Sequence, residues 1–425
     1  MNKKYITKLD LFKLHDPNDK IDEWIHAKGE NLTFELMRSI NNTKYTKTKL
    51  VKYFMKKYNI SIASAERFVY LKREWYPLVL IEELVTLTNS QKYDVQDKIE
   101  YLKTSKPPVV EVKAVKELTI NICKITGAHA ADGTLNDCFI AITDRHKSTI
   151  LCLIKWFKEF EYIPKLNRIG KNEYGIRFHS KILSRYLTKI FDFPSGCKQY
   201  TVTEPHIIKD SSLEYRKAFA LGALTFEGGF AIKNQVEFCV SSKAFRDSIV
   251  DILANSGVSY ISMEKKSSGY WRFWSNALTT NEAKKWIDFF EPESEKGLKL
   301  NEFINGFSKK VNSIDEASEI FSYVYPLQSS SKVTLTNVLN AMKDLKTAHR
   351  YLLADYLVKK NNLKSFGGKW AHSLKHYIDI LKKANIITTE KKEFGKKKSF
   401  GSIIREVYTY NENLDEWRLP KREII

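Results

Sequence analysis

An internal repeat in the middle of the chain constrains the fold more than any other feature of the sequence. The stretch "ITGAHAADG" is matched farther on by "ALGALTFEG"; both have glycine at the third place and end in an acid followed by glycine. The two acids, Asp132 and Glu227, are 95 positions apart, and so are Arg177 in "GIRFHSK" and Arg272 in "YWRFWSN". Two landmarks that keep one register predict a duplicated structural unit.

Each copy has the same predicted order of elements. A helix that ends in the acid-glycine pair is followed by a short strand, a second strand ("FIAITD" or "VEFCVSS") and a long amphipathic helix. A second hairpin and a last helix close the unit, which gives αββαββα in residues 119–210 and again in 211–324. We expect the first motif helix to begin at Thr119 and the second to carry a capping box of Ser211 and Glu214.

The two motif helices are predicted to pack against each other. Small residues, Gly127 and Ala128 in one copy and Gly222 and Ala223 in the other, leave a helix face that allows backbone-to-backbone contact. The terminal acids would then lie together, each at the unfavourable end of a helix dipole. Such a pair needs a counter-charge, and carboxylate oxygens suit Mg²⁺, which keeps waters and takes further ligands from phosphate.

The strands of each unit indicate a nucleic-acid surface. In the second hairpins, apolar residues alternate with Arg177 and His179 in the first copy and with Arg272 and Trp274 in the second. One face of each sheet would be apolar and the other basic and aromatic, suited to a DNA groove. Two such sheets related by pseudo-symmetry would form a saddle with the paired acids at its centre.

Predicted domains flank the repeats. Residues 1–105 read as helical, and "TKTKLVKYFMKKY", a turn and "IASAERFVYLKREW" are consistent with a helix-turn-helix unit or an unrelated helical domain. Residues 106–118 and 325–332 are linker-like. Residues 333–425 contain three helical patterns and a basic hairpin, which resemble a winged helix; a small α+β domain with a solvated lysine loop is the alternative. The predicted class is therefore α+β, a tandem αββαββα core between these two flanking domains.

The composition indicates the kind of partner and the cellular compartment to expect. The chain of 425 residues has a formal net charge of +20 and a pI near 9.4, which favours a polyanionic partner over a merely lysine-rich surface. Five isolated cysteines without a CxxC pair argue against a zinc ribbon or a disulfide framework. The start lacks a signal-peptide pattern and "YPLVLIEELV" is too short and charged to span a bilayer, so we expect an intracellular protein, cytoplasmic and nucleoid-associated, without a membrane partner.

The repeated motif resembles that of the monomeric, double-motif LAGLIDADG homing endonucleases, over residues 119 to about 310. The resemblance implies a freestanding, Mg²⁺-dependent hydrolase that cuts both strands of duplex DNA, with Asp132 and Glu227 as catalytic metal ligands. The implied metal site also includes the glycines that follow them, Gly133 and Gly228. Ala130 and Thr225 replace a further acid that many members carry at a structural place, and His129 is interpreted as a core or interface histidine.

The resemblance also implies residues around the metal site and on the DNA surface. Lys198 in "FPSGCKQ" and Lys299 in "GLKLNEF" are the predicted catalytic lysines that hold solvent near the metal. The predicted DNA-binding residues follow strands, lie in hairpins or belong to the C-terminal domain: Asp144, Lys147, Lys165, Arg168, Arg177, His179, Lys233, Ser242, Lys243, Lys265, Arg272, Lys375, Lys396, Lys397 and Lys398. The first hairpin of the first repeat, with its turn at Asn136 and Asp137, is short, which argues against a long sequence-specific site.

Two other functions stay open. A non-cutting transcriptional regulator built on the same core would explain the flanking domains, whereas retention of both acids favours a nuclease. An intron RNA maturase would use the same basic saddle for structured RNA, since the charge term binds either nucleic acid. In each case the internal repeat supplies both half-sites, so a monomer is expected.

Overall fold

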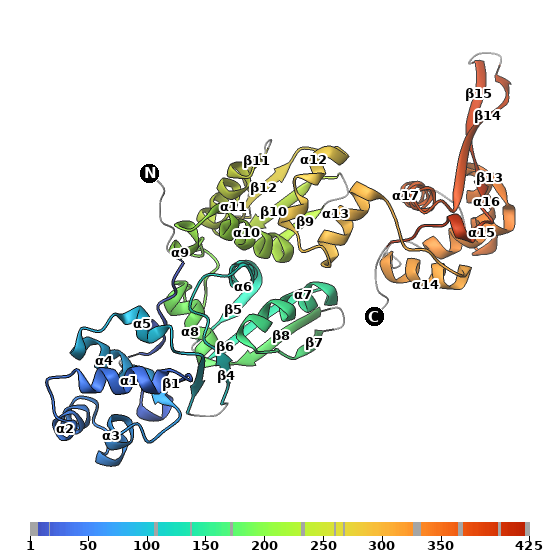
Figure 1. The fold of residues 1–425 in the computed structure, drawn as a ribbon. Helices are drawn as coiled ribbons and strands as arrows, with labels where there is room; N and C mark the ends of the chain where they lie inside the picture. Colours follow the sequence, from blue (N-terminus) through green and yellow to red (C-terminus); the bar gives the residue numbers. More distant parts are fainter. Residues whose placement is uncertain are drawn as a thin grey trace. The chain divides into compact units, whose positions relative to one another are not determined.

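The computed structural model divides into two compact units, residues 1–297 and residues 298–425, which are described separately here (Figure 1). It describes residues 7–16, 18–105, 109–136, 138–170, 173–230, 234–258, 261–266, 268–325, 333–363, 369–397 and 401–420, and only the backbone at 323, 369–373, 395–397 and 401–403. Pro107 and Pro108 of the first predicted linker, and residues 326–332 of the second, lie outside these ranges. Among the described residues, no helix is both long and apolar enough to cross a bilayer.

The N-terminal part of the first unit combines helices with a sheet. Its strands form an antiparallel sheet of order β2-β1-β3-β4. The elements are η1 (Leu11–Leu14), η2 (Ile21–Glu23), β1 (Ile25–Lys28), α1 (Leu32–Asn41), α2 (Lys47–Tyr58), α3 (Ile62–Val69), β2 (Tyr76–Pro77), α4 (Leu78–Thr88), α5 (Lys92–Gln96), β3 (Tyr101–Thr104) and β4 (Glu111–Lys113). The prediction of a purely helical segment is therefore wrong. Strands β1 and β3 are four residues long and pair across more than seventy residues of chain, so no local hairpin signal marks them.

The predicted helix, tight turn and helix are present as α2 and α3. Thr46 and Ser61 cap the two helices by accepting hydrogen bonds from backbone N–H groups three residues ahead. Asn59 closes α2 in the left-handed conformation (φ 49°), which an asparagine adopts at low cost. Phe54 of α2 and Phe68 of α3 are buried in edge-to-face contact, so the two helices share one apolar core.

The N-terminal segment also docks on the first repeat. Arg185 donates two hydrogen bonds to the carboxylate of Asp19, and Lys181 donates a third at 2.7 Å. Arg185 is buried and reaches the carbonyl of Leu14 as well, at 2.9 Å. Because a buried guanidinium needs its partners, these contacts tie the segment to the repeat.

The two repeats have the same order of elements, as predicted. The first contains α6 (Ile120–Asp132), β5 (Gly133–Leu135), β6 (Phe139–Asp144), α7 (Lys147–Phe157), η3 (Lys158–Phe160), β7 (Leu166–Gly170), β8 (Glu173–His179), α8 (Lys181–Arg185) and the π-turn η4 (Tyr186–Ile190). After α9 (His206–Lys209), the second contains α10 (Leu213–Glu227), β9 (Gly228–Phe230), β10 (Val236–Val240), α11 (Lys243–Asn255), β11 (Ile261–Lys265), β12 (Trp271–Ser275), α12 (Thr280–Lys284) and η5 (Ile287–Phe289). Both sheets are antiparallel, of order β5-β6-β8-β7 and β9-β10-β12-β11.

The caps of the two motif helices differ from each other. Thr119 caps α6 by accepting from the N–H of Ile122, as predicted. The predicted capping box on α10 is wrong: its N-cap is Ser212, which makes no side-chain cap bond. The Ser211 hydroxyl instead donates to the carbonyl of Ile208 at 2.6 Å, and the Ser211 N–H donates to the same carbonyl at 3.0 Å, in the turn that ends α9.

The equal spacing of the two arginines does not place them at equivalent positions in the sheets. In the first repeat Gly133 pairs with Ile142 and Ile142 with Ile176, so Arg177 follows this row by one residue. In the second, the same row runs from Gly228 through Phe238 to Phe273, and Arg272 precedes it by one. A shift of two residues keeps both arginines on the face opposite the core. The shift arises in two places: the second repeat has one more residue between Gly228 and its partner Phe238, and one more between Phe238 and Phe273, than the first repeat has at the corresponding places.

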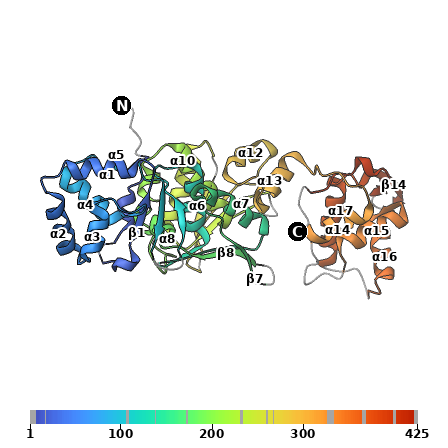
Figure 2. The ribbon, with the colours of Figure 1, turned by 60° about the horizontal axis from the view of Figure 1, so that its bottom comes forward.

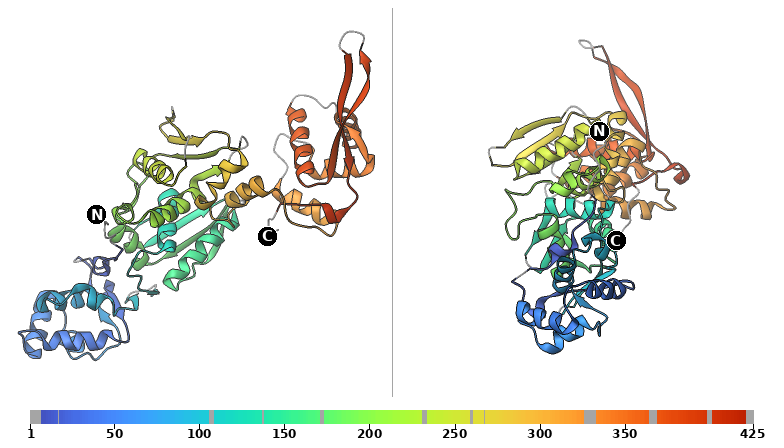
Figure 3. Two further views of the ribbon diagram at one scale, coloured as in Figure 1. Left: turned by 45° about the horizontal axis from the view of Figure 1, so that its top comes forward. Right: turned by 60° about the vertical axis from the view of Figure 1, so that its left-hand side comes forward.

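The second unit consists of helices and one hairpin-bearing sheet. Its elements are α13 (Glu295–Asn305), which begins in the first unit, α14 (Ile314–Val324), α15 (Leu335–Leu345), β13 (Thr347–His349), α16 (Arg350–Lys360), α17 (Lys369–Lys383), β14 (Ile387–Lys397), β15 (Gly401–Tyr410) and η6 (Leu414–Glu416). The sheet order is β13-β15-β14, and Leu339, Leu357, Leu381 and Trp417 lie in one buried core. Strands β14 and β15 project as a long hairpin beyond the helices of this unit (Figure 3). The predicted three helices and hairpin are present; the three-residue strand β13 was not predicted.

Candidate functional site

The paired acids are positioned by two helices in backbone contact. A Cβ added at Gly127 of α6 would lie 2.0 Å from the carbonyl oxygen of Phe219, and one at Gly222 of α10 would lie 2.1 Å from that of Lys124. No side chain fits at either place, so the predicted close packing of α6 and α10 is confirmed (Figure 2). Their last residues are Asp132 and Glu227.

The glycine after each acid is required for space. Gly133 and Gly228 have φ of −89° and −66°, values that any residue adopts. A Cβ at Gly133 would lie 2.1 Å from Nδ1 of His129, and one at Gly228 would lie 2.5 Å from the carbonyl oxygen of Leu224. Each glycine therefore lets the chain turn directly from helix into strand, which holds the acid at the junction.

Burial and neighbouring carboxylates raise the pKa values of both acids. Removal of bulk water around Asp132 raises its pKa to about 6, with the nearby Asp144 charge adding to the rise. Burial likewise raises the pKa of Glu227 to about 7, and the Asp132 charge adds to it. Asp132 is exposed and Glu227 half-buried, so both remain reachable from solvent. Like charges at the negative ends of two helix dipoles disfavour ionisation together and create a demand for a cation.

Two lysines flank the acids. Nζ of Lys198 donates to the carbonyl of Ala130 at 3.1 Å, and Nζ of Lys296 donates to the carbonyl of Phe226. Burial lowers the pKa of Lys198 to about 7, although the charges of Asp132 and Glu227 oppose the fall. Each lysine is thus held by the last turn of one motif helix.

Lys198 was predicted from the sequence, whereas Lys296 was missed. The predicted Lys299 is exposed on α13, one turn beyond Lys296, and it is the Lys296 charge that lowers the pKa of Asp132 and Glu227. The 95-residue spacing of the two repeats does not relate these two lysines, because Lys198 lies in a loop and Lys296 in the first turn of a helix. The prediction from sequence position therefore named Lys299, one helical turn beyond Lys296, which lies beside the acids.

A third carboxyl group stands beside the pair. Asp144 ends β6, accepts a hydrogen bond from the N–H of His146 at 2.6 Å, and has its pKa raised by burial, with the Lys296 charge opposing the rise. The sequence predicts Asp144, which follows the second strand, as one of the DNA-binding residues. In the second repeat Val240 occupies the equivalent position of the sheet. Asp144 lies two residues after Ile142, the partner of Gly133, and Val240 lies two residues after Phe238, the partner of Gly228. The second repeat therefore has no equivalent of this acid.

The donor set suits a hard divalent cation that is completed by other ligands. Asp132 and Glu227 present carboxylate oxygens, which Mg²⁺ prefers, and burial together with a neighbouring carboxylate makes the ionised form of each acid costly. Within the described part of the chain, no three His, Cys, Asp or Glu side chains converge closely enough to hold a metal alone. Water and phosphate oxygens would have to supply the remaining ligands, so the residues fit a cation shared with a nucleic-acid backbone.

His129 is a buried core residue, as interpreted from the sequence. Its side chain is fully buried against Phe193, 5.0 Å between ring centroids, and neither ring nitrogen has a hydrogen-bond partner. Burial lowers its pKa well below the ordinary range, with the Lys198 charge adding to the effect. The histidine is therefore neutral and packs beneath the helix end.

The predicted DNA-facing residues differ in how far their side chains are exposed. Exposed ones are Lys165, Arg168, Arg177, His179, Lys243, Lys265 and Lys375, and Lys147 and Arg272 are half-buried. Ser242 is the exception: it is buried, donates to the carbonyl of Val202 at 2.6 Å and caps α11, so its predicted contact with DNA is wrong. Lys233 and Lys398 lie outside the described residues, and for Lys396 and Lys397 only the backbone of β14 is described.

The two sheets present their arginines differently. Arg177 is exposed and has no carboxylate partner among the described residues. Arg272 donates to Glu237 at 2.7 Å, lies 3.5 Å from Glu264, and stacks 5.0 Å from the ring of Trp274. The basic face predicted for both sheets is thus open in the first repeat and occupied by internal ion pairs in the second.

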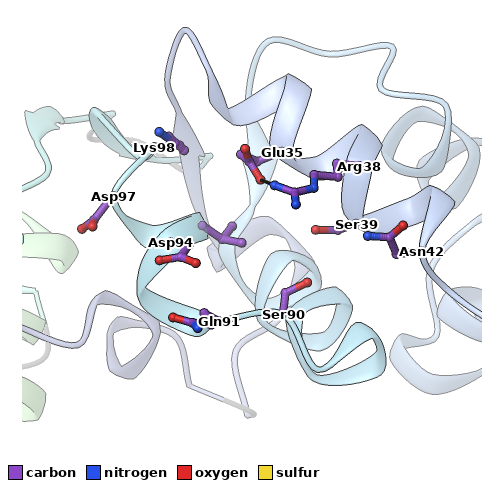
Figure 4. Close-up of a pocket in the computed structure, with 10 residues that line it drawn as sticks. Glu35, Arg38, Ser39, Asn42, Ser90, Gln91, Asp94, Asp97 and Lys98 are labelled. Carbon is purple, nitrogen blue, oxygen red and sulfur yellow. Dashed lines mark ion pairs between the residues drawn. The ribbon is translucent and has the colours of Figure 1, made fainter.

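A separate polar pocket of about 460 Å³ lies in the N-terminal part (Figure 4). Charged and amide side chains from α1, α5 and the segments flanking α5 line it: Glu35, Arg38, Ser39, Asn42, Ser90, Gln91, Asp94, Val95, Asp97 and Lys98. Both signs of charge are present, and the residues of the paired-acid site are not among those that line it. This pocket is not part of the site described above.

Comparison with known proteins gives structural neighbours alone. No family model matches the chain, and no curated protein matches it. Mesophilic variants of the homing endonuclease I-DmoI are 17% identical, with 40% of this chain and 94% of theirs covered and a TM-score of 0.31. The homing endonuclease I-WcaI bound to its DNA recognition sequence is 11% identical (44% and 85% covered, TM-score 0.31). Full-length DUF199/WhiA from Thermatoga maritima is 12% identical (62% and 91% covered, TM-score 0.31). Similarity at this level carries no functional argument, so function has to be argued from the site.

Proposed function

We propose that this protein is a divalent-metal-dependent endonuclease that cuts duplex DNA, of the LAGLIDADG type. The observation that carries the proposal is the juxtaposition of Asp132 and Glu227 at the ends of two helices in backbone contact. A costly pair of like charges, in which burial raises both pKa values and the Asp132 charge raises the pKa of Glu227 further, has no structural use. It has a use in catalysis, where a cation between them would meet a phosphodiester.

The residues divide the chemistry as follows. Asp132 and Glu227 would hold Mg²⁺, which when bound lowers the pKa of a water and offsets charge that develops on the phosphate. With its pKa near 7, Lys198 can take or give a proton at neutral pH, and the carbonyl of Ala130 fixes its Nζ beside the acids. Lys296, fixed by the carbonyl of Phe226, would place a second positive charge next to Glu227.

The exposed faces of the two sheets would hold the duplex. Arg177 and His179 stand on the open face of the first sheet, and Lys165 and Arg168 on the neighbouring strand segment are exposed. Guanidinium and imidazole groups at alternate positions along a strand can reach phosphates and base edges in a groove. Because the two repeats supply both half-sites, we infer that one chain acts on both strands.

We also propose that both flanking regions contact duplex DNA. In the second unit α15, β13, α16, α17, β14 and β15 follow the order of a winged helix, with the exposed Lys375 on the third helix of that set. In the N-terminal part, α3 exposes Arg67, and Lys47 and Lys72 lie 5.6 and 5.7 Å from the ring of Tyr70 just beyond it. These basic surfaces would extend a short contact in the first repeat.

The test is cleavage of genomic DNA with Mg²⁺, with new ends mapped by sequencing. The matched variant is Asp132→Asn with Glu227→Gln, which keeps the shapes of the side chains and removes both charges. Paired breaks that disappear in the variant support the nuclease. Tight binding without breaks, unchanged in the variant, contradicts it and leaves a non-cutting DNA regulator; preference for structured intron RNA over duplex DNA at equal salt would instead favour a maturase.

A further inference from the structure

The second unit carries an exposed cluster of rings around one arginine, here called the aromatic cluster: His349, Tyr351, Phe394 and Arg405. These residues come from β13, the first turn of α16, β14 and β15, of which the last two form the projecting hairpin (Figures 1 and 3). The side chain of Tyr351 is 64% exposed and that of Phe394 is 45% exposed. Large rings held at the surface by other residues are candidates for contact with a partner.

Arg405 is held between two rings. Its guanidinium carbon lies 5.1 Å from the ring centroid of Tyr351 and 5.5 Å from that of Phe394. Nη1 is 3.4 Å from Nε2 of His349, whose ring in turn meets that of Phe394 edge to face at 5.2 Å. His349 is itself fixed, because its Nδ1 accepts the N–H of Leu352 and caps α16. The cluster is thus preorganised while its rings stay exposed.

The charge of the cluster selects its partner. Among the described residues Arg405 has no carboxylate partner, and Glu393, opposite Ile404, faces the other side of the hairpin. Lys392 pairs with Arg405 across the strands on the same side; its nearby carboxylate is Glu390, to which it is ion-paired. A cation with spare donors between two exposed rings suits an anion that also has flat faces. Nucleic acid meets both conditions, since bases stack on rings and phosphates accept from guanidinium.

We propose that the aromatic cluster binds single-stranded nucleic acid, with unpaired bases stacked on Tyr351 and Phe394 and the backbone near Arg405. Base faces are covered by neighbouring pairs in a duplex, so a duplex cannot use the two rings in this way. The proposal goes beyond the endonuclease function and does not depend on the paired acids. A protein that nicks or opens DNA would gain a site for a displaced strand, and binding of single strands would exist without any cleavage.

The test uses the full chain with Asp132→Asn and Glu227→Gln, in EDTA, so that failure of the nuclease proposal cannot affect it. Fluorescence anisotropy compares a labelled oligothymidylate with a duplex of equal length. Tyr351→Ala with Phe394→Ala should weaken single-strand binding by about 10-fold or more and duplex binding by less than about 2-fold, because only unpaired bases lose their stacking partners. Tyr351→Phe, which keeps the ring, should bind like the parent. Phe34→Ala, which removes an equally exposed ring from α1, is the matched control.

Photo-crosslinking of the parent chain gives a second measurement that needs no ring variant to fold. Crosslinked peptides from oligothymidylate should contain Tyr351 or Phe394. The proposal is overturned if crosslinks map elsewhere, if the alanine variant binds single strands normally, or if it loses duplex affinity equally. The proposal is also overturned if Tyr351→Ala with Phe394→Ala leaves nucleic-acid binding unchanged and alters only the molecular mass measured by light scattering. The cluster would then be a contact between copies of this chain.

Discussion

The two repeats share one backbone plan and differ in where their charges lie. Each has a motif helix that ends in an acid, a glycine that turns it into a strand, and a four-stranded antiparallel sheet. The first repeat adds Asp144 beside the acids and leaves Arg177 open, whereas the second has Val240 in the same row and pairs Arg272 with Glu237 and Glu264. The shared part is what the fold requires, and the charges are free to diverge.

Under the proposed function, this difference bears on how a duplicated fold would handle an unequal substrate. The helix pair and strand order must match in both halves, because α6 and α10 pack at backbone distance and a change in either displaces both acids. Charges on the exposed faces meet only solvent or substrate, so they tolerate change. A chain with one open and one internally paired arginine is suited to two different half-sites rather than to a palindrome.

The largest effect is expected from substitutions that disrupt the contact between α6 and α10, which belongs to the plan shared by the two repeats. Gly127→Ala or Gly222→Ala should lower the free energy of unfolding by more than about 3 kcal/mol, because the new Cβ would overlap a carbonyl oxygen on the facing helix. Alanine favours helix over glycine by about 1 kcal/mol, so a loss of stability can come only from the contact between the helices. Urea denaturation measures it. Gly229→Ala, whose Cβ would meet its nearest neighbour at 3.4 Å, is the control. Equal stability of Gly127→Ala and the parent would contradict the backbone contact.

Sequence patterns predicted this shared part because it is local and repeated. The small residues, the acid-glycine pairs and the cap at Thr119 each depend on neighbours within a few positions. The small residues and the acid-glycine pairs also appear twice in one register, which separates them from chance. The order of strands and helices in each repeat followed from the same periodicity.

What the sequence did not predict depends on contacts between distant segments. Lys296 replaces Lys299 because the approach of α13 to the acids is set by packing, not by counting residues from the motif. The two-residue offset of Arg272 is the sum of one extra residue between Gly228 and Phe238 and one between Phe238 and Phe273. The N-terminal sheet joins strands that are far apart in the chain. No local pattern carries such information.

A second prediction sharpens the comparison at the acids. Asp144→Val makes the first repeat resemble the second at this row and should slow cutting of one DNA strand by about 10-fold or more, as loss of groups that support a metal site does. The other strand should change much less. Strand-specific labels on a duplex that contains the mapped site measure both rates, and Asp144→Asn separates loss of charge from loss of shape. If both strands slow equally, the asymmetry of the two halves has no part in catalysis.

A third prediction concerns the exposed faces. Arg177→Ala should weaken duplex binding by about 10-fold and lower the dependence of log affinity on log salt by about 1, because a free cation is lost. Arg272→Ala should cost less, since binding of Arg272 must first break its pairs with Glu237 and Glu264. Glu237→Gln should then strengthen binding by freeing the arginine. Anisotropy titrations at several salt concentrations test all three; equal losses for the two arginines would remove the proposed difference between the faces.

The smallest expected effect is on the stability of the metal-free protein. Folding raises the pKa of Asp132 from 3.8 to about 6 and that of Glu227 from 4.5 to about 7, so the folded chain keeps protons that the unfolded chain releases. Their contribution is therefore fully present below about pH 4 and is lost as pH rises towards 7. Because Asp132 is exposed and screened, the resulting fall in Tm should be no more than about 2 °C.

The first repeat should account for more of this pH dependence than the second. Asp144 raises the pKa of both Asp132 and Glu227, whereas Val240 carries no charge. Asp144→Asn should accordingly flatten the fall in Tm between pH 4 and 7, and Glu237→Gln, which removes a carboxylate from the exposed face of the second sheet, should leave it unchanged. Calorimetry in EDTA across this range measures the slopes. An unchanged slope in Asp144→Asn would mean that the third carboxyl group does not act on the pair, and the difference between the two halves would then reduce to their DNA-facing arginines.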